Sequence, residues 1–220
     1  RFPYDPVNDF QPIGRLGSNA NFWAAGPAVP PDVTTMEAFV AWGRGRDLAF
    51  GSWANGSTGH AFGLMLAEEA GLRMTHIAYR GEAPAVQDLL AGNIHGGLHS
   101  SGAAGELVRA GRLRALASTG NVRLPSLPDV RTFREIGFSD RFAFTGFSGL
   151  LGPRNLPAPM TGRLAEAFAR VAQDPEVQRR LIAMDTFPGY LGPEEFRRFI
   201  ADALERWRGI SERLGLQADG

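Results

Sequence analysis

Gly51-Ser52-Trp53-Ala54-Asn55-Gly56-Ser57-Thr58-Gly59-His60 is the stretch of sequence that decides the fold. It follows a short apolar run, Leu48–Phe50, which predicts a strand, and it leads into an apolar pattern that predicts a helix over 58–70. A strand, a glycine-rich turn and a helix start together direct backbone N–H groups and the positive end of a helix dipole at one point. The stretch therefore predicts a pocket for a carboxylate or a phosphate. An ordinary tight turn capped by Thr58 is the alternative interpretation.

Composition narrows the classes of function. With 220 residues, 44% of them apolar, the chain can form one large domain or two small ones. The formal net charge is zero, and no basic face indicates a nucleic-acid partner. The lack of cysteine excludes disulfides, thiolate metal sites and cysteine nucleophiles. No apolar run approaches the roughly 20 residues of a membrane span. The glycine-rich stretch has neither the lysine of a P-loop nor dinucleotide-turn spacing, so nucleotide binding is not supported.

The first half of the chain predicts an α/β fold. Residues 1–31 are expected to be an extended connector with one strand over 21–25, and Thr34-Thr35-Met36-Glu37 fits a capping box that opens a helix. Short strands and helices then alternate, with strands over 48–50, 74–79, 94–98 and 113–118 and helices over 58–70, 84–91 and 102–110. This alternation indicates a parallel or mixed sheet that is covered on both faces.

The pattern changes after Thr119. We expect a brief helix over 132–136, an aromatic-rich strand over 142–151, and three helices over 157–172, 174–184 and 193–214. Asp174 is the expected N-cap of the second of these helices, with Pro175 at its first position. A strand-rich middle followed by a helix-rich end suggests two lobes, with the chain crossing between them near Ala24 and near Ala143.

Nine short motifs occur in an order that matches a known family. They are Pro3-Tyr4-Asp5-Pro6 with Asp9-Phe10, Gly51–His60, Ala78-Tyr79-Arg80-Gly81 with Pro84-Ala85, Asp88-Leu89-Leu90-Ala91-Gly92, Gly111-Arg112-Leu113-Arg114-Ala115-Leu116-Ala117, Leu127-Pro128-Asp129-Val130, Gly149-Leu150-Leu151-Gly152-Pro153, Asp174-Pro175 with Val177, and Pro193-Glu194-Glu195-Phe196. Over essentially its whole length the chain thus resembles the Bug family, the extracytoplasmic solute receptors of tripartite tricarboxylate transporters.

The resemblance implies a two-lobed, periplasmic-binding-protein-like (Venus flytrap) receptor in the bacterial periplasm. Such a receptor captures a small organic anion without catalysis or a cofactor, and its partners are membrane transporter subunits. Family members start upstream of the Pro-Tyr-Asp-Pro motif, and this sequence starts at Arg1 without a signal peptide. We therefore expect an incomplete first lobe, residues 1–23 and 144–220, which lacks the N-terminal third, and a complete second lobe over 24–143.

An incomplete first lobe would leave the apolar faces of its helices exposed. The sequence leaves three ways to cover them: an upstream segment, a second copy in a homodimer, or repacking of the helices on the second lobe. For a chain this short we favour the homodimer.

The resemblance assigns candidate ligand contacts to the glycine-rich stretch. The members are Ser52, Trp53, Asn55, Ser57, Thr58 and His60. The hydroxyls and the amide would donate to a carboxylate, and Trp53 would form a wall of the cleft. Turn and cap chemistry, with Trp53 in loop packing, is the alternative.

Four further candidates lie outside this stretch. His99 and Ser100 end a strand, where open sheets present ligand contacts, and a histidine there would favour an anionic ligand. A rim histidine that faces water is the alternative. Arg80 is placed to pair with a carboxylate, or else serves the lobe surface or hinge. Phe147 is expected to line the cleft where the chain returns to the first lobe, with core packing as the alternative.

Metal binding and catalysis are the competing hypotheses. His95 and His99 are four residues apart on an expected strand, about 13 Å from each other, which is too far for one ion. A hydrolase or isomerase would need His60 or His99 as a base beside a serine, but no Gly-x-Ser-x-Gly elbow is present. We therefore expect no metal site and no enzyme. A truncated fragment that acts as a protein-interaction module is the third hypothesis.

Overall fold

The computed structural model describes residues 4–216, which divide into two compact units. Unit 1 comprises Arg1–Asn19 and Gly146–Ile210, and unit 2 comprises Ala20–Thr145 and Ser211–Gly220. The lobe boundaries expected from the sequence, 1–23 with 144–220 and 24–143, stay a prediction. Each unit is described here by itself.

Unit 2 contains a mixed five-stranded sheet, as the sequence predicts. Its elements are β2 (Phe22–Ala25), α1 (Met36–Gly43), β3 (Asp47–Ser52), α2 (Thr58–Ala70), β4 (Arg73–Ala78), α3 (Glu82–Ala91), β5 (Gly96–His99), α4 (Ser101–Arg109), β6 (Arg114–Ser118) and the 3₁₀-helix η1 (Asp140–Ala143). The strand order is β4-β3-β5-β2-β6. β3 runs parallel to β4 and β5, and β2 runs antiparallel to β5 and β6.

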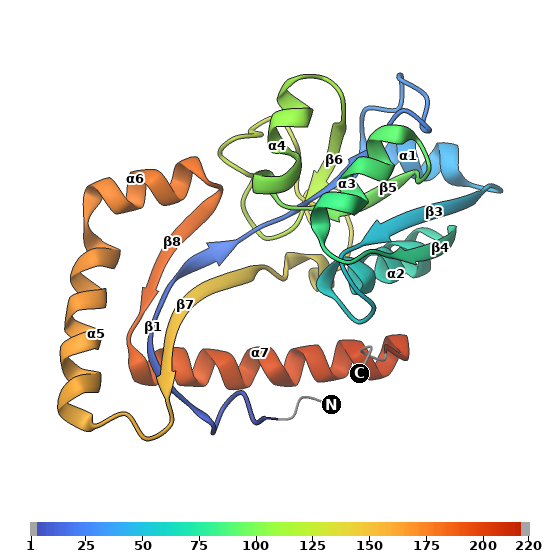
Figure 1. Ribbon diagram of the computed structural model, residues 1–220. Helices are drawn as coiled ribbons and strands as arrows, with labels where there is room; N and C mark the ends of the chain where they lie inside the picture. The colour runs from blue at the N-terminus through green and yellow to red at the C-terminus, as the bar shows by residue number, and fades with distance from the viewer. Residues whose placement is uncertain (1–3, 217–220) are drawn as a thin grey trace. The chain divides into compact units, whose positions relative to one another are not determined.

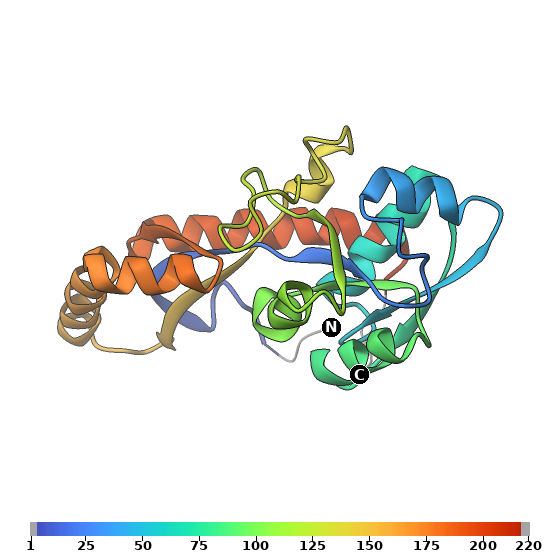
Figure 2. The same ribbon diagram turned by 90° about the horizontal axis from the view of Figure 1, so that it is seen from above.

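Helices cover both faces of this sheet (Figures 1 and 2). On one face Phe50 of β3 lies against α2, so close that a Cβ on Gly63 would meet the Phe50 ring at 1.9 Å. On the opposite face His99 of β5 lies 3.6 Å from Glu82 of α3. Side chains at successive strand positions point to opposite faces. Gly51 follows Phe50 and pairs with Gly97, which lies two positions before His99, so Phe50 and His99 point to opposite faces. α2 and α3 therefore lie on opposite sides of the sheet.

Two local expectations for unit 2 are wrong. The N-cap of α1 is Thr35, whose side chain accepts from the N–H of Ala38, so N3 is an alanine and the expected capping box of Thr34 with Glu37 does not form. Residues 133–137 form a turn instead of a helix. In this turn the Glu135 carboxylate accepts from Thr132 N–H and the Thr132 hydroxyl accepts from Glu135 N–H. The turn ends at Gly137, whose φ of 91° breaks a helix.

Unit 1 contains an antiparallel three-stranded sheet in the order β7-β1-β8. Its elements are β1 (Phe10–Asn19), β7 (Gly146–Pro153), α5 (Ala158–Gln173), α6 (Pro175–Ala183), β8 (Thr186–Leu191) and α7 (Pro193–Leu214), the last of which continues into unit 2. Asp174 ends α5 and caps α6 by accepting from Glu176 and Val177, so the two helices meet at a bend (Figure 1). This cap confirms the predicted helix start.

Unit 1 corrects three expectations. Residues 10–19 are a central strand instead of a connector, and β8 is a third strand that the sequence did not reveal. Position 17 of β1 must be glycine, because a Cβ there would meet the carbonyl oxygen of Phe187 at 2.4 Å. A glycine inside a strand weakens the alternating pattern by which the sequence would predict it. The strand expected over 142–151 begins only at Gly146. Phe142 lies instead in η1 and is fully buried against Phe133 in unit 2.

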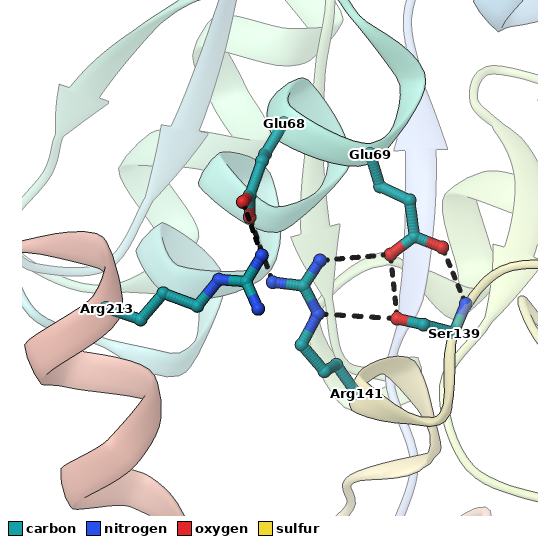
Figure 3. A network of polar contacts seen from close by, with 5 residues as sticks. All are labelled: Glu68, Glu69, Ser139, Arg141 and Arg213. Carbon is teal, nitrogen blue, oxygen red and sulfur yellow. Dashed lines mark hydrogen bonds and ion pairs between the residues drawn. The ribbon is translucent and has the colours of Figure 1, made fainter.

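A network of charged side chains lies at the C-terminal end of α2 (Figure 3). Arg141 donates to Glu68 at 2.9 Å and to Glu69 at 3.2 Å, and Arg213 donates to Glu68 at 2.7 Å. Ser139 also donates to Glu69 through its N–H and its hydroxyl. Carboxylates are unfavourable at the negative end of a helix. The two arginines offset this cost, and hydrogen bonds from Arg141 and Arg213 lower the pKa of Glu68.

Within residues 4–216, none of the helices combines the length and the apolar character that crossing a bilayer requires.

Candidate functional site

The candidate site lies where the parallel strands of unit 2 end. β3 ends at Ser52 and β5, its neighbour, ends at His99, so these residues share one edge of the sheet. α2 leaves β3 on one face, and α4 lies with α3 on the other (Figure 1). Such a divergence of helices at the carboxyl ends of neighbouring strands is the usual ligand position in open α/β sheets.

A chain of hydrogen bonds fixes the Ser52–Gly59 loop, which we define as the segment from the last residue of β3 into the first turn of α2. Ser57 is the N-cap of α2, and its Oγ accepts from His60 N–H at 3.2 Å. Ser57 Oγ donates to Ser52 Oγ at 3.1 Å, and Ser52 Oγ donates to the carbonyl of Ala54 at 2.9 Å. Both hydroxyl hydrogens are thus engaged inside the loop.

The donors that remain are at the start of α2. No acceptor contacts the N–H of Thr58 or of Gly59 among the residues that the structure describes. Two such groups at a helix start, together with the helix dipole, are of the kind that binds anions, and we call this arrangement the anion seat. Trp53 lies beside them, since its ring borders Gly59. Asn55 lies in the turn that ends at Gly56, which has a φ of 70°.

Two histidines lie against the loop. The rings of His60 and His76 are stacked, with centroids 3.6 Å apart and an interplanar angle of 10°. Ser52 Oγ is 2.7 Å from His76 Nε2, and Gly56 N–H donates to His60 Nδ1 at 3.1 Å. Burial and then the charge of His60 lower the pKa of His76 to about 4, and burial lowers the pKa of His60. Both rings are therefore neutral near pH 7.

The second predicted cluster, His99 and Ser100, lies against a carboxylate of the chain itself, which is bonded to Ser100. Glu82 accepts from Ser100 N–H at 2.6 Å and from Ser100 Oγ at 2.9 Å, and its Oε1 lies 3.6 Å from His99 Nδ1. Burial alone would raise the pKa of Glu82, but the His99 ring and the Ser100 donors outweigh it and lower that pKa. A carboxylate of the chain itself thus bonds to Ser100, the N-cap residue of α4.

His99 is not a rim histidine. Its side chain is fully buried, and neither ring nitrogen has a hydrogen-bond partner in the described part of the chain. The hydroxyls of Ser101 and Ser118 are likewise buried without a partner at the same edge of the sheet. Buried polar atoms without partners are rare in native structures and indicate a place for water or a ligand.

Arg80 and Phe147 are the two remaining candidates. Arg80 is exposed after β4, with no hydrogen-bond or ion-pair partner in residues 4–216. Phe147 belongs to unit 1, where it packs edge-to-face on Phe196 and Phe199 of α7. His95 accepts from Ala49 N–H. The described residues contain no group of three or more metal-ligating side chains.

Sequence reasoning missed His76 and Glu82. His76 reaches the loop only through the parallel register that pairs it with Phe50, and this register is a long-range property. A signal for Glu82 was present, because it opens α3 directly after the Tyr79-Arg80-Gly81 motif.

The arrangement is of the periplasmic-binding-protein class. The structure of the periplasmic binding protein BugD shares the fold with a TM-score of 0.83 at 24% identity, over 98% of this chain and 73% of that one. The chain belongs to the tripartite tricarboxylate transporter receptor family, whose sequence profile matches residues 1–216. This match confirms the resemblance drawn from the nine motifs.

Two similar proteins illustrate how the chain compares with members of this family. BugT of Bordetella pertussis is 28% identical over 97% of this chain and 65% of BugT. The structure of Rpa4515 of R. palustris with adipate is 26% identical, with a TM-score of 0.89 over 98% of this chain and 72% of that one. The chain spans about two thirds of the length of the curated relatives it matches, 67% and 65% for two of them.

Proposed function

We propose that this chain is the ligand-binding part of a periplasmic solute receptor, which captures a small organic anion by a carboxylate and releases it unchanged. The observation that carries the proposal is the anion seat at the start of α2, where the N–H groups of Thr58 and Gly59 have no acceptor among the described residues. Membership of a receptor family supports it, and so does the adipate in the Rpa4515 structure.

The carboxylate would accept from both N–H groups and from the Thr58 hydroxyl. Hydrogen bonds to a charged acceptor contribute about 1.5–3 kcal/mol each when they form away from bulk water. Trp53, beside Gly59, would contact the apolar body of the ligand. We retain the remaining candidates, Ser52, Asn55, Ser57, His60, Arg80, His99, Ser100 and Phe147, as proposed members of the site that shape or select the ligand.

The hydrogen-bond directions favour binding over catalysis. A serine nucleophile must give its proton to a base. Ser52 gives its proton to the Ala54 carbonyl and Ser57 gives its proton to Ser52. His60 Nδ1 accepts from Gly56, and His99 has no hydrogen bond to a serine in the part of the chain described here. We therefore propose that the chain is not a hydrolase or isomerase.

The receptor role implies partners and a location. We propose that the whole protein resides in the periplasm and delivers its ligand to membrane transporter subunits, and that no nucleic acid takes part. The homodimer expected from the sequence stays a prediction. Unit 1 exposes apolar side chains on β7 and α5 that association would cover, among them Leu150, Leu151, Met160 and Leu164. Light scattering at micromolar concentration tests the homodimer, and a compact monomer would contradict it.

Calorimetry with a panel of mono- and dicarboxylic acids tests the proposed function. At least one acid should bind and be recovered unchanged by mass spectrometry. Replacing Ser57 and Thr58 together with alanine should weaken binding by about 1–3 kcal/mol. His99→Asp should also weaken it, because a second carboxylate would lie beside Glu82.

Thr35→Ala is the matched control, since Thr35 caps α1 and lies outside the site. It should leave the affinity unchanged. Unchanged affinity in the Ser57/Thr58 double variant would remove the α2 start from the site, and a new product in the recovered ligand would contradict the receptor role.

A further inference from the structure

The protons of the stacked histidines can be assigned from their hydrogen bonds. Ser52 has one hydroxyl hydrogen, which goes to the Ala54 carbonyl at 2.9 Å. The 2.7 Å contact between Ser52 Oγ and His76 Nε2 therefore requires His76 to donate. His60 is assigned in the same way: its Nδ1 accepts from Gly56 N–H, so its ring proton is on Nε2. In both rings Nδ1 is the atom that would take a second proton.

A second proton has different consequences at the two rings. On His60 it would replace the acceptor of Gly56 N–H with a donor, and the hydrogen bond between the loop and α2 would be lost. On His76 it would leave the bond to Ser52 intact but would place a positive charge against a ring 3.6 Å away. The bond between Gly56 and His60 therefore exists only while His60 is neutral.

Among the described residues, no charge other than that of the histidines themselves shifts the pKa of either ring. β3 contributes the Phe50 ring, whose centroid is 5.0 Å from that of His76 and 6.4 Å from that of His60. The elements α2, β3 and β4 pack against the pair. Within the described residues His60 is the one titratable group that acts on His76, and burial alone shifts the pKa of His60. Burial and the repulsion from His60 lower the pKa of His76, and no carboxylate of residues 4–216 counteracts them.

We propose that His60 and His76 are positioning residues of the Ser52–Gly59 loop: they fix the loop in its anion-binding conformation through Gly56 N–H and Ser52 Oγ, and a second proton on His60 releases it. This inference rests on the proposed function, in which the same loop presents the N–H groups of Thr58 and Gly59 to a carboxylate. It adds that acidification opens the loop before the unit unfolds.

Histidine and amide NMR of the full chain tests the proposal without a ligand. At pH 7.5 both rings should show a proton on Nε2 alone. As the pH falls, the Gly56 amide signal should move with the midpoint of the His60 titration, and its hydrogen-exchange rate should rise at least tenfold over that expected from pH alone. A Gly56 signal that ignores the His60 titration, or a proton on His60 Nδ1 at pH 7.5, would overturn the proposal.

Three variants separate positioning from a general structural role. His60→Gln keeps a side-chain acceptor that does not titrate, so the Gly56 signal should become independent of pH. His60→Ala should leave Gly56 N–H exposed at every pH. His95→Gln is the matched control, because His95 accepts from Ala49 N–H outside the loop, and it should leave the Gly56 profile unchanged.

Acetate, used as the probe at pH 7.5, connects the loop to anion binding. Its affinity, followed at the Thr58 and Gly59 amides, should fall at least threefold in His60→Ala and remain unchanged in His95→Gln. Equal affinity in wild type and His60→Ala would overturn positioning. If acetate does not shift the Thr58 and Gly59 amide signals of the wild type, the anion seat is contradicted. If the Gly56 amide signal still moves with the His60 titration in that case, the contact between His60 and the loop is nevertheless established.

Discussion

Ser57→Ala tests the local hydrogen-bond chain at the candidate site. Ser57 caps α2, and loss of such a cap costs about 1 kcal/mol of stability. The substitution also removes the donor to Ser52 Oγ, which is fully buried, and this adds about 0.5–1 kcal/mol. Unit 2 should therefore lose about 1.5–2 kcal/mol.

Urea unfolding followed by tryptophan fluorescence measures this loss. Trp23, Trp42 and Trp53 lie in unit 2 and Trp207 lies in unit 1, so the signal reports mainly on unit 2. Thr35→Ala, which removes only the cap of α1, should cost about 1 kcal/mol and serves as the comparison. A Ser57→Ala loss below that of Thr35→Ala would refute the second contact of Ser57.

Three further predictions concern stability. Gly63→Ala places a Cβ 1.9 Å from Phe50. Overpacking should cost about 3 kcal/mol, which exceeds the gain in helix propensity of about 1 kcal/mol, so the melting temperature should fall. An unchanged melting temperature would contradict the close packing. Arg141→Ala should lower it more than Arg213→Ala, since Arg141 bonds two carboxylates, and the reverse order would refute that ranking. The pKa of His76, about 4 in the fold and 6.5 unfolded, means that the unfolded chain binds more protons between these values. Stability should thus fall by about 1 kcal/mol from pH 7.5 to pH 4.5, after allowance for solvent screening. His76→Gln should flatten this profile in urea titrations.

Elements with local signals were predictable from the sequence. Helix α2 over 58–70 and helix α7 over 193–214 match their expected bounds, because Gly71 follows the end of α2 and Glu194 and Glu195 lie in the first turn of α7. Asp174 was identified as a cap for the same reason, since its side chain bonds to the next two N–H groups of its own helix. The order of the motifs was enough to identify the family.

Features that depend on distant pairing were not predictable. β1 and β8 contain glycines and prolines, so neither shows the alternation of apolar and polar residues that is typical of a strand. The pairing of Phe50 with His76 depends on sheet register, and only that pairing brings His76 to Ser52. His99 was identified as a strand-end residue, but its burial beside Glu82 depends on how α3 packs on the sheet.

The central claim is that the start of α2 is a seat for a carboxylate. The most direct measurement is a two-dimensional ¹H–¹⁵N NMR titration of the full chain with adipate, the acid present in the Rpa4515 structure. The account predicts that the amides of Thr58 and Gly59 show the largest saturable downfield shifts in unit 2. Saturable shifts confined to other helix starts, with Thr58 and Gly59 unmoved, would contradict it.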